Sequence, residues 1–546
     1  MNKDDFFFVE VLIFEALTVG IMLVLALRYP SLGATWCRKV SRVINRIAMR
    51  QMTSVLLVGI IAVAGSIAVS LLIHLPQPRI HDEFSYLLAA DTFASGRLSN
   101  PPHPMWPHFE TAHIIQQPTY ASKHPPAQGL LLAIGQMMGG HPIVGVWISS
   151  GLMSAAICWM LQAWLSPRWG LLGGLLVAAR LGMFGYWSQS YWGGALAAIG
   201  GTLVFGALRR IIRQPRVHDS ILLGVGLAIL ANSRPFEGLL VSLPAAATLF
   251  VWMIGNNGPA AKVSNRKIVL PIFAVLVLTG AAMGTYNKQV TGNMFQMPYQ
   301  VYQKTYAIAP VLVWQTARIE PTYHHKVMRD FHRWELDQYR RLQSMSELLK
   351  SARTRLMKLW YFYLGPLLTV PLLLLPCMWS DRWMRLVLLT SGLLMIVLLL
   401  VETWVLPHYA APMTGLVYVS VLQGMRHLRA WRWRGKPAAR FMVRVIPACI
   451  FASLVLTFML ELNWTLQRQP NPRSRILTQL KETGDRHLVI VRYSPTHSVH
   501  EEWVYNEADI DGADVVWARE MDKARTRELI AYFSDRKVSL LETDMN

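Results

Sequence analysis

Long apolar segments alternate with shorter polar ones along most of the 546-residue chain. Residues 52–75 and 385–401 are two examples, and such segments approach or exceed the roughly 18 to 20 residues that a helix needs to cross a bilayer. The pattern predicts about twelve transmembrane helices, near residues 6–27, 52–75, 143–165, 171–187, 192–208, 220–233, 237–255, 268–286, 357–376, 385–402, 408–424 and 441–460. The predicted fold class is therefore a polytopic α-helical membrane protein.

The composition of the chain agrees with this fold class. Hydrophobic residues make up 53% of the chain and charged residues only 16%, whereas soluble domains have roughly 25% charged residues. This balance excludes a soluble domain with a single core. The first apolar segment is too long for the hydrophobic part of a cleaved signal peptide, so residues 6–27 are predicted to be a retained span.

Positive charge is concentrated between the predicted spans. The chain has 53 Lys and Arg residues against 32 Asp and Glu, a net charge of +21. Most of the excess falls in four blocks: Arg28, Arg38, Lys39, Arg42, Arg46 and Arg50; Arg209, Arg210, Arg213 and Arg216; Lys262, Arg266 and Lys267; and Arg426, Arg429, Arg432, Arg434, Lys436, Arg440 and Arg444. Basic residues in short loops favour the cytoplasmic side. They explain the net charge, so no nucleic-acid partner is predicted.

This orientation predicts that three long hydrophilic segments, residues 76–142, 287–356 and 461–546, lie together on the outer side. The second segment is itself rich in arginine, but loops longer than about 60 residues have little influence on topology. The third contains three short strand patterns and one amphipathic helix pattern, at residues 487–493, 513–520, 537–543 and 524–535. It is therefore predicted to form a small extracytoplasmic α/β domain.

The predicted organisation has three parts. Residues 1–50 form an additional N-terminal span and a basic cytoplasmic loop, and residues 51–460 form the main transmembrane domain with two of the outer segments. Residues 461–546 form the α/β domain.

An acidic pair opens the first outer segment, because Asp82 and Glu83 follow the second span by only a few residues. Residues 84–96 have a helical pattern, so both acids are expected in the first turn of a helix. Adjacent residues on a helix point about 100° apart, so the two carboxylates do not face one reacting atom. We expect Asp82 to act chemically and Glu83 to orient the site, although acids at a membrane boundary can also be simply solvated.

Several further motifs accompany the acidic pair. They are Tyr86, Asp91 and Gly96; HPPAQGLLLAIG at 124–135; SRPFEG at 233–238; YNKQVTGNMFQMPYQVY at 286–302; and LPHYAAP at 406–412. With these motifs the chain resembles the GT-C membrane glycosyltransferases, in particular the bacterial protein O-mannosyltransferase-like (family 39-type) branch. The likeness covers roughly residues 50–425. The N-terminal span and the α/β tail lie outside it.

The resemblance implies a GT-C-like fold and an inverting glycosyltransferase. The donor would be a polyprenyl-phosphate-linked sugar, and the acceptor an unidentified glycan, lipid or protein. The reaction would take place at the periplasmic face of the bacterial inner membrane, among membrane lipids. The resemblance also implies that the loop Asp is the general base.

The chemistry of such a transfer indicates which residue types the site needs. An attacking hydroxyl must lose a proton, which a carboxylate accepts. The departing lipid phosphate needs positive charge and hydrogen bonds. The expected site residues are Asp82 and Glu83 for catalysis; Arg234, Lys123, His124, His408 and Tyr409 for the donor phosphate; and Asp91, Glu237, Tyr299 and Tyr302 for the substrate pocket.

Several of these residues have a structural alternative. Arg234 and Glu237 lie three residues apart and can pair across one helical turn. His408 can equally be an interfacial histidine, Lys123 an exposed lysine, and the tyrosines interfacial anchors.

Histidines also recur in the outer segments. His103, His108 and His113 follow one another every five residues, and His324 and His325 are adjacent. Five-residue spacing does not place side chains on one helical face. No metal and no other cofactor is therefore predicted, and a zinc site is left as the alternative.

Two other functions fit a polytopic protein. A transporter or lipid flippase also needs many spans and polar helix breaks, but it concentrates its ionisable residues at mid-bilayer. Here these residues gather in the outer segments. The other alternative is a cell-envelope scaffold whose α/β tail binds a partner.

Overall fold

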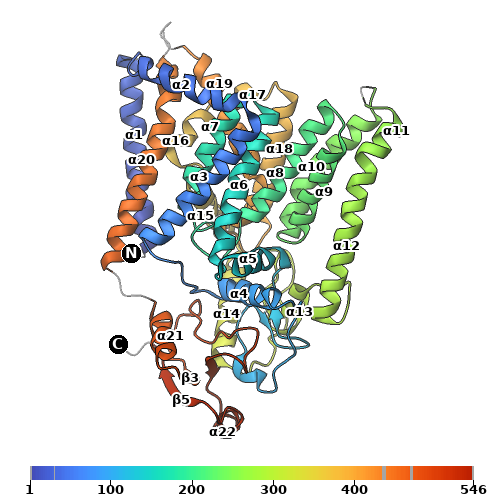
Figure 1. Cartoon of the computed structure of the whole chain (residues 1–546), viewed down its shortest axis with the longest axis vertical. Helices are drawn as coiled ribbons and strands as arrows, with labels where there is room; N and C mark the ends of the chain where they lie inside the picture. Colours follow the sequence, from blue (N-terminus) through green and yellow to red (C-terminus); the bar gives the residue numbers. More distant parts are fainter. Residues whose placement is uncertain (1–2, 30, 257, 433–437, 468–470, 544–546) are drawn as a thin grey trace.

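The computed structural model describes residues 3–29, 31–256, 258–432, 438–467 and 471–543. Figure 1 shows a bundle of long helices above a smaller layer of short helices, strands and loops. The functional residues discussed below lie where these two parts meet.

Long apolar helices form the bundle. Within the described residues, eight are long and apolar enough to cross a membrane: α1 (Lys3–Arg28), α3 (Gln51–Leu72), α6 (Ile143–Trp164), α8 (Ala195–Arg213), α10 (Pro235–Ile254), α12 (Leu270–Thr291) with the turns before it, α18 (Arg382–Leu400) and α20 (Ala438–Gln467). The prediction of a polytopic helical membrane protein is confirmed.

The other four predicted spans fall on shorter or interrupted helices. They are α7 (Pro167–Val177) with the π-helical turn η2 (Ala178–Gly182), α9 (Val217–Ala231), α15 (Met345–Tyr363) with α16 (Gly365–Leu372) and α17 (Leu375–Met378), and α19 (Thr414–Ala430). Proline in the first turn of α10 and of α16 marks the breaks between α9 and α10 and between α15 and α16, since proline begins a helix readily but disrupts its interior.

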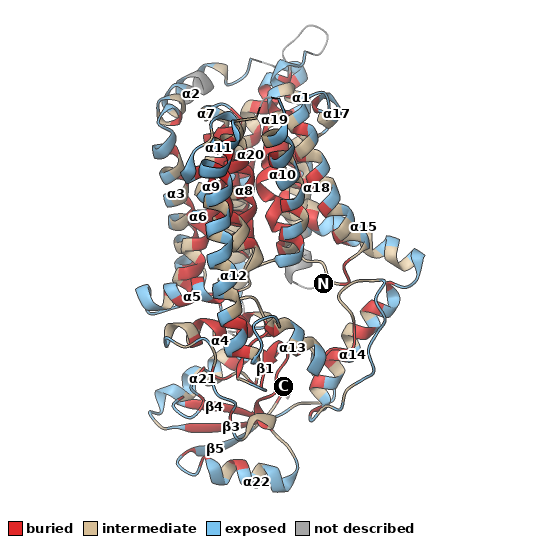
Figure 2. Ribbon diagram, turned by 90° about the vertical axis from the view of Figure 1, so that its right-hand side faces the viewer, coloured by how far each residue is buried: buried red, intermediate tan, exposed pale blue. Residues whose placement is uncertain are grey.

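Small residues let the central helices approach closely. A Cβ added to Gly226 of α9 would lie 2.7 Å from the carbonyl oxygen of Gly200 on α8. Packing through small residues is typical of helices in a bilayer. Figure 2 shows buried residues along the inner faces of the bundle, whereas α12 is exposed along most of its length.

The smaller layer contains the three long polar segments at one end of the bundle (Figures 1 and 2). It includes α4 (His81–Ala94), α5 (Pro126–Gly139), α13 (Pro298–Thr305) and α14 (Lys326–Arg341), together with the strand pair β1 (Ile114–Ile115) and β2 (Ala121–Ser122). The helices α2 (Ala34–Met49) and α11 (Ala261–Ser264), each in a basic block, lie at the opposite end. The three segments therefore share one end of the bundle; that this end is the outer side stays a prediction.

The C-terminal residues form the predicted α/β unit. After α21 (Pro472–Glu482), the strands β3 (His487–Arg492), β4 (Val515–Arg519) and β5 (Lys537–Glu542) form a parallel sheet in the order β4-β3-β5, and α22 (Lys523–Tyr532) connects β4 to β5. Leu488 and Val516 share a hydrophobic core with Leu88 and Phe109 of the first outer segment. The C-terminal unit thus packs directly on that segment.

Candidate active site

A cavity of about 520 Å³ lies between the bundle and the smaller layer. Eight of the eleven predicted site residues line it: Asp82, Lys123, His124, Arg234, Glu237, Tyr299, His408 and Tyr409. They come from five separate parts of the chain, so the fold brings most of the predicted site together.

The remaining three predicted residues, Glu83, Asp91 and Tyr302, do not line the cavity. Both carboxylate oxygens of Glu83 accept backbone N–H groups, from Arg79 at 3.0 Å and Tyr191 at 3.3 Å. Burial raises the pKa of Glu83 to about 7. Glu83 therefore joins the start of α4 to the loop before α8.

Asp91 and Tyr302 also make structural contacts. Asp91 accepts the N–H of Ala508 at 2.6 Å and so connects α4 with the C-terminal unit. The Tyr302 hydroxyl lies 3.2 Å from the ring of the buried His332, while its own ring lies under Lys123.

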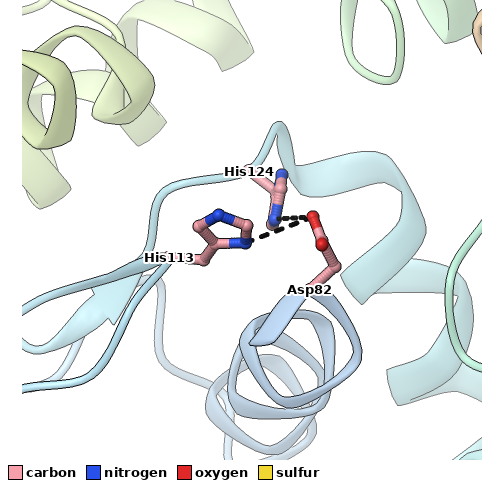
Figure 3. Close-up of side chains that lie close together, drawn as sticks. All are labelled: Asp82, His113 and His124. Carbon is pink, nitrogen blue, oxygen red and sulfur yellow. Dashed lines mark ion pairs between the residues drawn. The ribbon is translucent and has the colours of Figure 1, made fainter. Parts of the chain in front are cut away.

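Asp82 lies in the first turn of α4 and points between two histidines (Figure 3). One of its carboxylate oxygens is 3.2 Å from Nδ1 of His113 and 3.2 Å from Nε2 of His124. These histidines flank the β1–β2 pair, where Ile114 is opposite Ser122 and Lys123 donates its N–H to the His113 carbonyl at 3.2 Å. The strand pair thus brings together two residues that are eleven positions apart.

The surroundings determine the charges at this point. Burial opposes ionisation of Asp82, but the two imidazoles outweigh it and hold the pKa of that carboxyl well below its usual range. Burial, followed by the charge of Lys123, lowers the pKa of His113 to about 3. At neutral pH the site therefore combines an ionised carboxylate with a neutral His113 imidazole.

Two cations face the same cavity. Lys123 is buried, with Nζ 4.5 Å from the Tyr302 ring centre, and burial lowers its pKa to about 8. Arg234 lies in the break between α9 and α10, with its guanidinium 4.2 Å from the Tyr409 ring centre. It is also 3.6 Å from Glu237, so the ion pair considered from the sequence is formed, and both of its members line the cavity.

The cavity contains functional groups that the sequence motifs did not indicate. Glu335 and Trp334 reach it from α14, Trp404 from the segment after α18, and His500 from the C-terminal unit. The Trp334 ring contacts both Trp404 and His500, at centroid distances of 5.3 and 4.4 Å. Only the packing of distant segments places these residues together, so no local spacing could have predicted them.

The recurring histidines separate into different roles. His113 belongs to the cavity, whereas His103 lies 3.1 Å from Asp511 and His108 lies 2.9 Å from the Arg519 carbonyl. The latter two therefore hold the C-terminal unit against the first outer segment.

Comparisons with known proteins give matches among solved structures only. No family model matches the chain, and no curated protein sequence matches it. Among solved structures, ArnT from Cupriavidus metallidurans bound to undecaprenyl phosphate is 12% identical, with 89% of each chain covered and a TM-score of 0.48. The Archaeoglobus fulgidus oligosaccharyltransferase in complex with Zn and sulfate is 11% identical, with 79% of this chain covered and a TM-score of 0.46.

The chain spans 60% of the length of that oligosaccharyltransferase. Its structural neighbours are thus GT-C membrane glycosyltransferases, the superfamily that the sequence resembles. At 11–12% identity and TM-scores below 0.5, these likenesses assign no activity to the chain. The activity is therefore inferred below from the residues that line the cavity.

Proposed function

We propose that the protein is an inverting glycosyltransferase that moves a sugar from a polyprenyl-phosphate donor to an acceptor hydroxyl. The observation that carries this proposal is the cavity itself. It combines the ionised Asp82 with two cations, Lys123 and Arg234, at the end of a membrane-spanning bundle. Such a cavity suits a reaction in which one group loses a proton and another leaves as an anion.

Asp82 would act as the general base. The acceptor oxygen attacks the anomeric carbon, its proton passes to the Asp82 carboxylate, and the bond between the anomeric carbon and the phosphate oxygen breaks. Direct displacement inverts the anomeric configuration. A positioned base of this kind typically contributes about 10²- to 10⁴-fold to the rate.

Lys123 and Arg234 would bind the phosphate. The donor is a phosphodiester with one negative charge, and the departing lipid phosphate is a monoester whose charge approaches about −2. Fixed cations in a cavity with little water stabilise this increase in charge. Arg234 adds two parallel N–H donors, and the first turn of α10 follows directly after it.

The position of the ionisable groups favours an enzyme over a transporter. Asp82, Lys123 and Glu335 belong to the smaller layer, outside the eight membrane-spanning candidates, and Glu237 lies in the first turn of α10. An ion pair between Glu15 and Arg180 lies within the bundle but does not line the cavity. A transporter would place its ionisable groups at the middle of the spans. We also propose that this layer faces the periplasm of a bacterial inner membrane, because the basic blocks favour the cytoplasm at the opposite end.

The proposal is tested with purified protein in lipid nanodiscs. It is incubated with a panel of polyprenyl-phosphate sugars and an extract containing candidate acceptors, and release of polyprenyl phosphate is measured. We expect release with at least one donor, dependent on the acceptor. The acceptors are taken from cells that lack this protein. If all donors stay intact although the protein is folded, the proposal is contradicted.

A further inference from the structure

Asp82, His113 and His124 present three ligand atoms to one point (Figure 3). The three atoms, one carboxylate oxygen and two imidazole nitrogens, all lie within 4.8 Å of one another. Carboxylate oxygen and imidazole nitrogen are common ligands of divalent transition metals in proteins. This combination arises from the fold and not from the five-residue histidine recurrence of the sequence.

The two oxygen–nitrogen separations match the edges of a metal coordination sphere. Zinc lies about 2.0 to 2.2 Å from oxygen and nitrogen ligands, so two ligands on one ion are about 2.9 Å apart at a right angle and about 3.4 Å apart at a tetrahedral angle. The Asp82 oxygen is 3.2 Å from each histidine nitrogen. Both distances fall inside that interval.

Both nitrogens face the Asp82 carboxylate, each at 3.2 Å. Nδ1 of His113 and Nε2 of His124 are buried and have no hydrogen-bond partner of suitable geometry among the described residues. A buried nitrogen without a partner costs free energy comparable to a lost hydrogen bond. Two such atoms directed at the same carboxylate oxygen indicate that a ligand completes the group.

The surrounding side chains hold the rings in place. The Tyr86 ring stacks on His124 at a centroid distance of 4.4 Å, and Phe331 contacts the His113 ring edge at 5.5 Å. The hydroxyl of Ser85 donates to the His113 carbonyl at 2.7 Å. Metal ligands fixed in this way bind an ion without reorganisation.

The charges of the cavity also favour a cation. Glu237 and Glu335 line the cavity with Asp82 and outnumber the two cations, Lys123 and Arg234. The cavity therefore has no excess of positive charge that would repel a divalent cation.

We propose that Asp82, His113 and His124 bind one divalent transition metal, preferentially zinc, with an open coordination position toward the cavity. This inference goes beyond the proposed function, because metal binding requires no donor and no acceptor. The oxygen of Asp82 that faces both histidines would bind the ion, and its second oxygen would remain to accept the proton of the acceptor. When bound, the metal would lower the pKa of a hydroxyl at its open position. The three residues hold the ion, and the cavity determines which hydroxyl reaches it.

The experiment uses the full chain, purified without a histidine tag and treated with a chelator. Zinc is added back, unbound metal is removed, and the bound ion is counted by plasma mass spectrometry. Cobalt replaces zinc in a second sample, because its visible absorption reports a four-coordinate site with nitrogen ligands. We expect about one ion per chain and an intense cobalt spectrum.

Variants identify the ligands. His113→Ala and His124→Ala are each expected to weaken zinc binding by at least about 100-fold, more than the 10- to 100-fold typical of residues that only support a ligand. His500→Ala is the matched control, because His500 lines the same cavity outside the group, and it should bind normally. Asp82→Asn provides a third test if a histidine variant does not fold.

Two results would overturn the metal site: no stoichiometric ion in folded wild-type protein, or equal loss of binding in the His500 control. Failure of this proposal is distinguishable from failure of the proposed function. Sugar transfer that persists in metal-free protein would show that the transferase activity needs no metal. A bound metal in a protein that transfers no sugar would support the metal site and contradict the proposed function.

Discussion

A buried ion pair of the C-terminal unit lies against the first outer segment. Glu502 accepts from Nη2 of Arg519 at 2.7 Å and from the Tyr493 hydroxyl at 2.6 Å, and it lies 3.5 Å from His81, the residue before Asp82. Replacing Glu502 with Gln leaves the buried Arg519 without its carboxylate. Breaking a buried pair in this way typically costs about 3 to 5 kcal/mol.

The pKa of Glu502 reflects the same pair and gives the sign of its pH dependence. Burial opposes ionisation, but Arg519 outweighs it and holds the pKa at about 2, below the ordinary value of 4.5. A carboxyl whose pKa is lower in the folded state stabilises the protein above pH 4.5, and this contribution is lost as the pH falls toward 2. A difference of about 2.5 pKa units corresponds to roughly 3 kcal/mol.

The assay is hydrogen exchange of the β4 amides in the full chain at pH 7. A loss of about 3 kcal/mol would accelerate exchange through local opening by roughly 100-fold. Glu501→Gln is the matched control, because Glu501 pairs with Arg79 at the surface, and surface pairs contribute at most about 1 kcal/mol. Equal exchange rates in the two variants would refute the importance of the buried pair. So would a stability of Glu502→Gln that falls with pH in the same way as that of the wild type.

Three further predictions concern the cavity and the orientation of the chain. Arg234→Ala should weaken donor binding by about 10- to 100-fold, whereas Glu237→Gln should still bind donor; equal loss of folded protein in both variants, with normal donor affinity in what survives, would show a structural pair. Glu83→Gln should retain more than a tenth of wild-type turnover because Glu83 does not line the cavity, and complete inactivity would return it to the catalytic group. Ser346→Cys in a protein whose native cysteines are removed should react with an impermeant reagent in intact spheroplasts. A second variant that keeps only the native Cys377, in α17 at the opposite end of the bundle, should be protected; the reverse pattern would invert the topology.

The sequence predicted those parts of the fold that depend on local pattern. Apolar length indicated the spans, short apolar runs indicated the buried strands β3 and β4, and the 100° step between neighbours on a helix separated Asp82 from Glu83. In the structure Asp82 lines the cavity and Glu83 turns toward Tyr191. The catalytic roles of both residues remain predictions.

The rest of the site depends on tertiary packing. His113 reaches Asp82 because two strands of two residues each reverse the chain, and strands that short leave no periodic pattern. Glu335 and His500 come from α14 and from the C-terminal unit, whose positions follow from packing between distant segments. Only the arrangement in space converts the histidine recurrence into one cavity residue and two contacts with the C-terminal unit.

The most direct test of the central claim compares turnover with donor binding in Asp82→Asn. The substitution keeps the shape of the side chain and removes its basicity, so turnover should fall by about 10²- to 10⁴-fold while donor affinity changes little. Asp337→Asn makes the same chemical change on the exposed face of α14 and should behave as wild type. Wild-type turnover in Asp82→Asn would contradict Asp82 as the general base of a glycosyl transfer.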